Sequence, residues 1–326
     1  MKSYFLGVAI LMLPYFPISK TPSVDKIALI QEKCEVLDAK GVLHGGILIA
    51  KTDSILYQKT FGFSKSNTEN ENHSHFNIAS MGKMFTGVAT MQLVAKGKLT
   101  LDTKIRDILP EFKENKGAQD ITIHHLLTHT NGLPDVFMMG LGLDPLNPTQ
   151  KTHAELVSIL KDKKLKHKPG KKWRYTNSGY VLLGRIIEKL SGQSYCDYIR
   201  TNLLEPADMK STGCGFGAGG AESTLMDMHK FSKALLTHEL LPEGMTENMM
   251  EGKVELEKGV RYAYGFFDSN RLKSREVSHS GGVGEQIHCQ LLMFVDTEYT
   301  VVIYSNNPLG FDAYHELRFM MRELLS

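Results

Sequence analysis

Two hydrophobic periods follow each other in the first part of the chain. Residues 24–40 carry apolar side chains at three- to four-residue spacing, and this pattern predicts an amphipathic helix. Residues 42–50 and 55–63 are rich in apolar and β-branched side chains and are separated by a polar turn at 51–54. These features predict two strands that form a hairpin after the first helix.

Strand-type alternation returns close to the C-terminus. Apolar side chains alternate over 287–295, a polar turn follows at 296–298, and a short apolar run occupies 301–304. A last helix has one apolar face, formed by Tyr314, Leu317, Met321 and Leu324. A lone hairpin is at best marginally stable in water, so we expect the N-terminal hairpin to join these late strands in one antiparallel sheet.

The middle of the chain, roughly 81–212, has a helical pattern, with helices predicted over 152–163 and 176–190. The sequence therefore predicts an α/β (α+β) fold, in which an antiparallel sheet is built from both ends of the chain and is flanked by helices. The sheet part comprises 24–80 and 213–326, and a mostly helical subdomain is inserted between them. We expect the functional site in the cleft between the two parts.

Composition and charge limit the classes of protein to which the chain can belong. The chain has 326 residues, of which 42% are hydrophobic and 23% charged, a balance typical of a globular protein. The formal net charge is only +2, too small to concentrate nucleic acid, so we expect no nucleic-acid partner. Four scattered cysteines are too few for a disulfide-built scaffold, and their spacing leaves open whether any of them pair.

The first residues have the pattern of an export signal. Lys2 precedes an apolar run over 5–16, which is too short to span a bilayer and has the shape of a signal peptide. We predict that residues 1–23 are a signal peptide or an N-terminal anchor. The protein would then be periplasmic or secreted, or held at the membrane by an uncleaved segment. The alternative is a buried N-terminal segment of a cytoplasmic protein.

A candidate nucleophile lies where the helical part begins. Ser80 and Lys83 form an S-x-x-K sequence, and a helix that starts at Ser80 places both side chains on one face. A serine hydroxyl is a weak nucleophile that needs a base or a cation beside it, and Lys83 can supply either. The positive end of the helix would also stabilise a developing anion. The alternative is a capping serine and a solvated lysine.

Two further short motifs follow. Tyr175 and Asn177 form a Y-x-N sequence, and residues 279–282 read His-Ser-Gly-Gly on a late strand. In this order, S-x-x-K, Y-x-N and H-x-G resemble the three motifs of the serine β-lactamase and penicillin-binding protein superfamily, in particular the branch of class C β-lactamases, D-aminopeptidases and family VIII esterases. The resemblance extends over about 45–306 and implies a β-lactamase/transpeptidase-like fold.

The resemblance also implies a role for each motif residue. Ser80 would form an acyl-enzyme, and Lys83 would share protons with it and lower its pKa. Tyr175, as a phenolate or by sharing a proton with Lys83, would act as general base in acylation, because Lys83 is expected to lower the pKa of this phenol. Asn177 would hydrogen-bond a substrate amide or Lys83. No cofactor and no metal are implied.

The same resemblance places the oxyanion hole at the backbone N–H groups of Ser80 and Gly282, with Gly281 and His279 on the substrate-binding strand. His279 stands where penicillin-recognising members carry lysine. An unperturbed histidine is mostly neutral at pH 7, so we expect neutral acyl groups to be preferred over carboxylate-bearing β-lactams. The deacylation glutamate of class A enzymes has no matching motif, so hydrolysis would rely on the Tyr175 side of the site.

Three other patterns carry less weight. His125 and His129 have the i, i+4 spacing of a metal site, but no glutamate follows His125 as in H-E-x-x-H. Residues 215–220 match G-x-G-x-x-G by letter, but no strand is predicted before them, so dinucleotide binding is not expected. Residues 161–172 contain seven lysines without aromatic side chains between them, which favours a solvated loop over an anion-binding patch.

Together these features predict an exported serine hydrolase that cleaves an ester, a D-amino-acid peptide or amide, or a β-lactam, in this order of preference. The expected partner is a small-molecule or peptide substrate, with cell-wall fragments as one candidate source. The alternative is a penicillin-binding-type sensor or scaffold that acylates slowly or not at all. Turnover discriminates between the two, because a sensor acylates once and stops.

Overall fold

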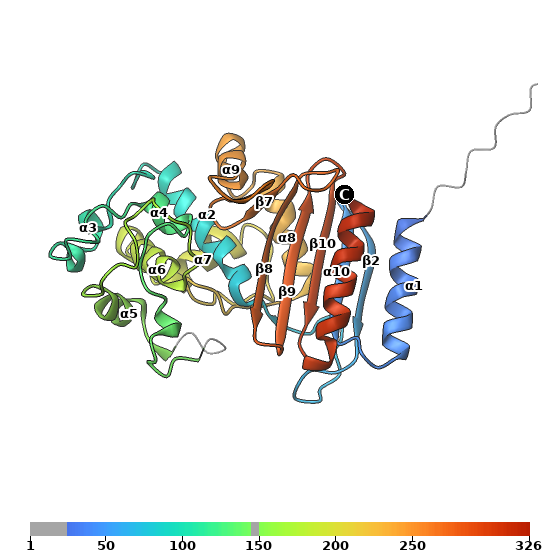
Figure 1. Cartoon of the computed structure of the whole chain (residues 1–326). Helices are drawn as coiled ribbons and strands as arrows, with labels where there is room; N and C mark the ends of the chain where they lie inside the picture. Colours follow the sequence, from blue (N-terminus) through green and yellow to red (C-terminus); the bar gives the residue numbers. More distant parts are fainter. Residues whose placement is uncertain (1–24, 145–149) are drawn as a thin grey trace, which may run out of the picture.

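An eight-stranded antiparallel sheet forms the centre of the molecule (Figure 1). The structure is a computed structural model that describes residues 25–144 and 150–326. The strands of the sheet lie in the order β2-β1-β10-β9-β8-β7-β6-β5. Their bounds are Gly45–Lys51 (β1), Ser54–Phe61 (β2), Val254–Glu257 (β5), Val260–Tyr262 (β6), Phe267–Ser269 (β7), Glu276–Val283 (β8), Ile287–Phe294 (β9) and Tyr299–Ser305 (β10). A separate pair joins Phe76–Asn77 (β3) to Glu222–Ser223 (β4).

The two ends of the chain meet in this sheet. β1 pairs antiparallel with β2 on one side and with β10 on the other, in a register that places Ile47 opposite Ile303. The pairing of β1 with β10 stabilises the β1–β2 hairpin, which would be at best marginally stable alone. The prediction that the N-terminal hairpin and the late strands share one antiparallel sheet flanked by helices is therefore confirmed.

Helices lie on both faces of the sheet and beside it (Figure 1). The α-helices are Lys26–Ala39 (α1), Gly82–Ala95 (α2), Ile105–Ile108 (α3), Ile123–Leu127 (α4), His153–Leu160 (α5), Asn177–Ser191 (α6), Tyr195–Ile199 (α7), Leu225–Leu236 (α8), Glu243–Met250 (α9) and Phe311–Leu325 (α10).

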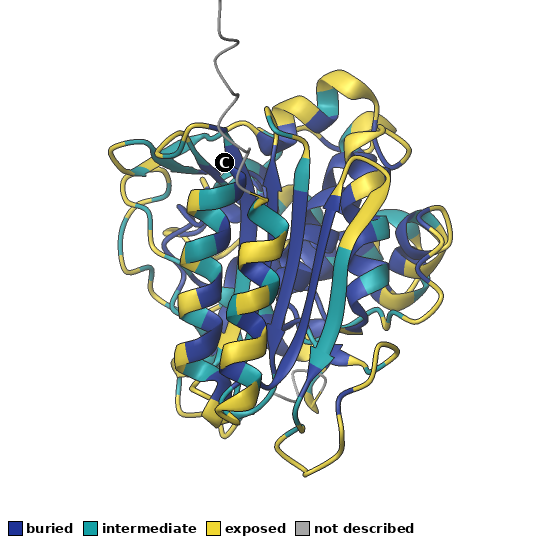
Figure 2. Ribbon diagram, turned by 90° about the vertical axis from the view of Figure 1, so that its right-hand side faces the viewer, coloured by how far each residue is buried: buried dark blue, intermediate teal, exposed yellow. Residues whose placement is uncertain are grey.

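The central strands are buried on both faces, which explains why their sequences read as continuous apolar runs. In β1, Ile47 and Ile49 belong to the cluster that α1 and α10 cover, whereas Leu48 and Ala50 belong to the larger cluster on the opposite face. Figure 2 looks onto α1 and α10 and shows buried strands behind them. The sheet is thus a rigid support for whatever its strands carry.

The helix α2 connects the sheet with the helical part. Almost every residue of α2 is buried, as expected of a helix with apolar or small side chains on all sides. The turn before α2 packs against β8, and α2 itself packs against α6 and α7 (Figure 1). The described residues within 81–212 form α2–α7, and the division of the chain into a sheet part and a helical subdomain stays a prediction.

Some strands were not predicted from the sequence, and one predicted segment lies outside the described residues. The short strands β5, β6 and β7 were not expected, because they are only three or four residues long and rich in polar side chains. The predicted signal peptide or anchor, 1–23, lies outside the described residues. Within the described part of the chain, none of the helices has the length and apolar character needed to cross a bilayer.

Candidate active site

Ser80 lies on a tight turn immediately before α2. The turn is a 3-10 helix over Ala79–Met81, and Ala79 has a φ of 42°, in the left-handed region that residues other than glycine rarely adopt. The Asn77 side chain accepts a hydrogen bond from the Ala79 backbone N–H at 2.8 Å and so fixes this conformation. Backbone strain of this kind persists where the surroundings enforce it, and it is concentrated at functional sites.

Two glycines allow backbone to approach this turn from both sides. A Cβ atom at Gly281, on β8, would lie 2.6 Å from the Ile78 carbonyl oxygen. A Cβ atom at Gly219 would lie 2.2 Å from the Ala79 carbonyl oxygen. The turn that carries Ser80 is therefore clamped between β8 and the 215–220 loop, and Gly281 contributes through this close packing.

Lys83 is buried beneath the turn, in the first turn of α2. Its Nζ lies 3.0 Å from Ser80 Oγ, 2.8 Å from Asn177 Oδ1 and 2.6 Å from the Ala218 carbonyl oxygen. Burial lowers the pKa of Lys83 to about 7, and the more distant carboxylate of Asp135 opposes this shift. A large fraction of Lys83 is thus uncharged near neutral pH.

The three contacts suit an uncharged amine. The Ala218 carbonyl only accepts hydrogen bonds, and the Asn177 amide is oriented by Asp135, which accepts from Asn177 Nδ2 at 3.0 Å. Asn177 Oδ1 is therefore the acceptor that faces Lys83. A neutral Lys83 can donate its two N–H groups to these oxygens and direct its lone pair at the Ser80 hydroxyl, which is the geometry of a general base.

Tyr175 stands beside this pair, with its ring centroid 5.0 Å from Lys83 Nζ. Burial raises the pKa of the Tyr175 phenol, and a hydrogen bond with Ser80 only partly offsets this effect. This direction is opposite to the expectation that Lys83 lowers the pKa of Tyr175, because burial and then the nearby carboxylate of Asp135 both favour the neutral phenol. Tyr175 is a neutral hydrogen-bonding group here, which leaves Lys83 as the candidate base.

His279 is buried behind the site rather than exposed to it, with only 1% of its surface accessible. Its Nδ1 lies 2.6 Å from the Ser280 carbonyl oxygen and its Nε2 lies 3.2 Å from Tyr262 Oη. Burial, and then the proximity of Lys83, lower the pKa of His279 to about 3. The low pKa agrees with the expectation of a mostly neutral histidine, but His279 does not line the pocket at Ser80 and instead contacts Tyr262.

The pocket at Ser80 is small, at about 80 Å³. Ser80, Asn177 and Gly282 line it together, as do Phe137 and the glycines of the 215–220 loop. Ser80 and Gly282, whose N–H groups the sequence proposes as oxyanion donors, are thus brought to one cavity. Tyr175 lines an adjoining groove instead.

Three supporting residues were missed by sequence reasoning. Asp135 accepts hydrogen bonds from the backbone N–H of Asn177 at 2.6 Å and from its side chain. The ring of His129 packs against that of Tyr175 at an interplanar angle of 36°, with centroids 4.3 Å apart, and its Nε2 lies 3.1 Å from Tyr262 Oη. Ala218 acts through its carbonyl, which no side-chain pattern can reveal. Asp135 could have been found, because it directly follows the family segment that ends at Pro134.

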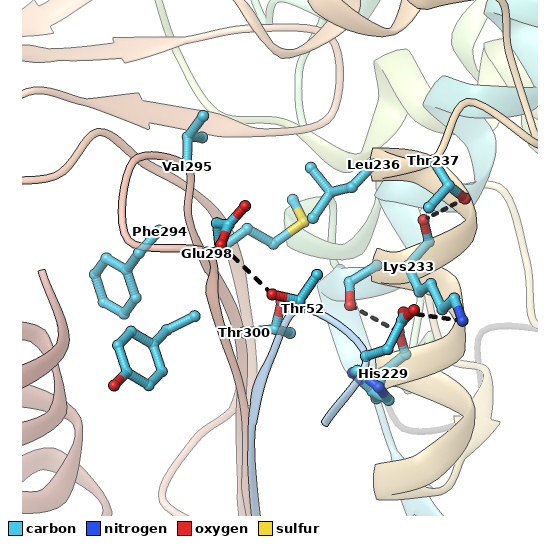
Figure 3. Close-up of a pocket in the computed structure, with 13 residues that line it drawn as sticks. Thr52, His229, Lys233, Leu236, Thr237, Phe294, Val295, Glu298 and Thr300 are labelled. Atoms are coloured by element: carbon cyan, nitrogen blue, oxygen red, sulfur yellow. Dashed lines mark hydrogen bonds and ion pairs between the residues drawn. The ribbon is translucent and has the colours of Figure 1, made fainter. Parts of the chain in front are cut away.

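A second pocket, of about 250 Å³, lies between α8 and the ends of the sheet strands (Figure 3). Its cation, Lys233, forms an ion pair with Asp53 at 2.9 Å, and Thr52 Oγ1 contacts Glu298 at 3.5 Å. None of the motif residues lines it. Within 25–144 and 150–326, no group of three or more His, Cys, Asp or Glu side chains is arranged to hold a metal ion.

Comparison with known proteins identifies the family. The Beta-lactamase family model matches residues 30–322. Penicillin-binding protein 4* of Bacillus subtilis (strain 168) is 29% identical over 327 residues, which cover 85% of this chain and 71% of that protein. The crystal structure of a penicillin binding protein from Bacillus halodurans has a TM-score of 0.76 and 26% identity, and covers 88% of this chain and 100% of its own.

A further structure shows likeness of fold alone. D-amino acid amidase from Ochrobactrum anthropi SV3, complexed with L-phenylalanine, has a TM-score of 0.77 at 21% identity and covers 92% of this chain and 97% of its own. Because the family model spans most of the sequence, the chain belongs to the β-lactamase family. It is a serine hydrolase of the β-lactamase fold, as the motifs predicted.

Proposed function

We propose that the protein acts by acyl transfer through a covalent acyl-enzyme on Ser80. The observation that carries this proposal is the contact of 3.0 Å between Ser80 Oγ and the buried Lys83 amine, whose pKa of about 7 leaves it free to accept a proton. The strained turn before α2 supports it, because it fixes the hydroxyl at the mouth of the small pocket.

The steps follow from these positions. As Ser80 Oγ attacks the acyl carbon, its proton passes to Lys83, and the carbonyl oxygen becomes an oxyanion held by the N–H groups of Ser80 and Gly282. The intermediate then collapses, the bond to the leaving group breaks, and the proton passes from Lys83 to the leaving group, with the neutral Tyr175 hydroxyl as a relay. Water attacks the acyl-enzyme by the reverse order of proton transfers, which releases the acid and restores Ser80.

The proposed substrate is an ester, followed by a D-amino-acid peptide or amide and then a β-lactam. The names of relatives support the last two classes, since one is a penicillin-binding protein and a structure of the same fold is a D-amino acid amidase. The neutral state of His279 supports the lower place of β-lactams, because no permanent cation stands where penicillin-recognising members carry lysine.

We also propose that the protein works outside the cytoplasm, in the periplasm or as a secreted protein. The disulfide between Cys196 and Cys214 supports this location, because such bonds persist in oxidising compartments. Fractionation of the native host, followed by mass determination of the mature N-terminus, tests the proposal. Recovery in the cytoplasm with reduced cysteines contradicts it.

The central test is detection of the acyl-enzyme by intact mass. A fluorophosphonate should add one label to the wild type and none to Ser80→Ala, whose folding is checked by circular dichroism. A panel of short-chain esters, D-amino amides and penicillins then measures turnover. Labelling of the alanine variant at an undiminished rate contradicts the Ser80 assignment. Stoichiometric acylation without turnover of any substrate favours the alternative, a penicillin-binding-type sensor.

A further inference from the structure

A large groove adjoins the Ser80 pocket on the side of Tyr175. Its volume is about 750 Å³, against about 80 Å³ at Ser80 itself. Three lysines from the lysine-rich run line it, and we call Lys163, Lys164 and Lys166 the groove lysines. Arg174 lines it as well, so that the basic groove gathers four cations. The sequence interpretation of this run as a solvated loop is thus incomplete.

The cations of the basic groove have no protein partner to neutralise them. Within 25–144 and 150–326, no ion pair or hydrogen bond involves the side-chain nitrogens of the groove lysines or of Arg174. The single carboxylate in the lining, Asp135, already accepts hydrogen bonds from Phe137 and Asn177. Like charges gathered without counter-charges repel each other, and an anionic ligand would relieve this repulsion.

The backbone that carries these cations is nevertheless fixed. The Lys166 N–H donates to the Gly132 carbonyl at 2.8 Å, and the Arg174 N–H donates to the His129 carbonyl at 2.9 Å. Asn115 Nδ2 also donates to the Lys163 carbonyl, at 3.2 Å. The lysine-rich run is therefore held against the site by its main chain, whereas its charged ends remain free to bind.

Two chain segments line both the basic groove and the Ser80 pocket. The segment 134–139 contributes Phe137 to the small pocket and Met138 to the groove. The segment 174–177 contributes Asn177 to the small pocket and Tyr175 to the groove. A molecule acylating Ser80 that is larger than the small pocket would extend past Tyr175 into the groove.

We propose that the basic groove is a substrate subsite for an anionic group, a carboxylate or a phosphate, on the part of the substrate that does not react. This inference rests on the proposed function, because it takes Ser80 as the acyl acceptor. The substrate would then combine a small acyl centre with an acidic extension. Its negative charge would be recognised beside Tyr175 rather than at the buried His279.

Binding can be measured without catalysis in the Ser80→Ala protein. The chain has one tryptophan, Trp173, which precedes the groove residue Arg174 in the sequence, and we expect its fluorescence to change when the groove is occupied. Inorganic tripolyphosphate and citrate serve as the phosphate and carboxylate probes. Replacing the groove lysines with glutamine should weaken binding of the preferred probe at least about tenfold, because several charge contacts are lost together. The two probes tell which anion the groove prefers.

The chain offers a matched control within the same lysine-rich run. Four of its lysines do not line the groove, and three of these, Lys168, Lys171 and Lys172, form the control set. Their replacement with glutamine removes the same net charge and should change the affinity by less than about threefold, since distant exposed charges are screened by salt. An equal loss in both triple variants, or no binding of either probe, overturns the proposal.

A kinetic measurement links the groove to the reaction. Three aryl acetates that differ in one leaving-group substituent, uncharged, carboxylate or phosphate, give the ratio of kcat/KM for anionic over neutral ester. The ratio should exceed one in the wild type and fall at least about fivefold in the groove-lysine variant but not in the control. A ratio that the groove variant does not change refutes the subsite and leaves the Ser80 assignment intact. If no ester is hydrolysed and Ser80 is never labelled, the proposed function fails instead.

Discussion

Two pockets of the molecule each contain a lysine, and the protein treats the two lysines in opposite ways. Lys83 is fully buried, contacts three uncharged oxygens, and has a pKa lowered to about 7 by desolvation. Lys233, in the pocket beside α8, is about half exposed and pairs with Asp53, whose hydrogen bond and charge raise the pKa of Lys233 (Figure 3).

The difference shows which property marks a reactive site. The pocket beside α8 is about three times larger than the Ser80 pocket, yet its lysine is paired with Asp53, which favours the protonated amine. The Ser80 pocket places an amine out of water without a carboxylate in contact, so that the amine can exchange protons near pH 7. Burial without a counter-charge, rather than cavity size, makes Lys83 the candidate base.

The largest expected effect comes from removing the amine of Lys83, and removal of the Lys233 amine is its control. Lys83→Met should slow acylation by roughly 10²- to 10⁴-fold, the range of general-base catalysis, because Ser80 loses its proton acceptor. Lys233→Met should leave the rate within about twofold, because an exposed ion pair remote from the site contributes little. The second-order rate of fluorophosphonate labelling measures both. Similar losses in the two variants would show that the contrast between the pockets is not catalytic.

The next largest effect on acylation is expected from a tyrosine near Ser80, and a tyrosine in the pocket beside α8 is its control. Tyr175→Phe should slow acylation by roughly 10²-fold, because the neutral phenol hydrogen-bonds Ser80 and relays the leaving-group proton. Tyr299→Phe, in the pocket beside α8, is the matched control and should change the rate less than about twofold. Stopped-flow hydrolysis of a short ester separates acylation from deacylation. Full activity in Tyr175→Phe would mean that Lys83 alone handles both proton transfers.

The pH profile gives a smaller effect with a defined sign. Because Lys83 must be unprotonated to accept the Ser80 proton, acylation should rise about tenfold per pH unit below its pKa of about 7 and level off above it. Asp135 raises the pKa of Lys83, so Asp135→Asn should move the midpoint to lower pH. Asp53→Asn, beside Lys233, should not move it. A wild-type midpoint above pH 9 would contradict a lowered pKa of Lys83.

The sequence could predict the reacting groups of this site but not their electrostatics. S-x-x-K, Y-x-N and H-x-G identify Ser80, Lys83 and Tyr175 because their spacing is local or shared with a family. The surroundings of Lys83 and the burial of His279 depend on segments far apart in the chain, among them the 215–220 loop and Tyr262. Desolvation is a property of the packed molecule, and no local pattern encodes it.

In the fold, too, features encoded by a local pattern could be predicted, whereas features that depend on tertiary contacts could not. The long strands β1, β2, β9 and β10 follow from alternating or continuous apolar runs, which are strong local signals. The edge strands β5–β7 depend on a buried carboxylate, Asp268, which pairs with Arg261 at 2.7 Å and with Arg275 at 2.8 Å. An aspartate disfavours a strand by local propensity, so only the tertiary ion pairs explain its place there.

The smallest expected effect on the rate comes from the covalent tether next to the Ser80 pocket. The Cys196–Cys214 disulfide links α7 to the start of the loop whose Ala218 carbonyl contacts Lys83 at 2.6 Å. Replacing both cysteines with alanine should lower the free energy of unfolding by roughly 2–4 kcal/mol, as expected for a bridge that closes a short loop. Acylation should slow only a few-fold, because the Gly217 carbonyl also accepts from Thr86 Oγ1 at 2.6 Å and keeps the loop in place.

Denaturant unfolding with and without a reductant measures this effect in the wild type, and the double-alanine variant is the control that a reductant should not change. The labelling rate under the same conditions separates stability from activity. If reduction abolishes labelling as strongly as Tyr175→Phe does, the tether itself holds Ala218 against Lys83, and the second anchor at Gly217 is insufficient. If reduction changes neither property, the loop is fixed by its hydrogen bonds alone. The expected result lies between these outcomes, because a disulfide acts mainly on the unfolded chain whereas the hydrogen bonds to α2 act on the folded site.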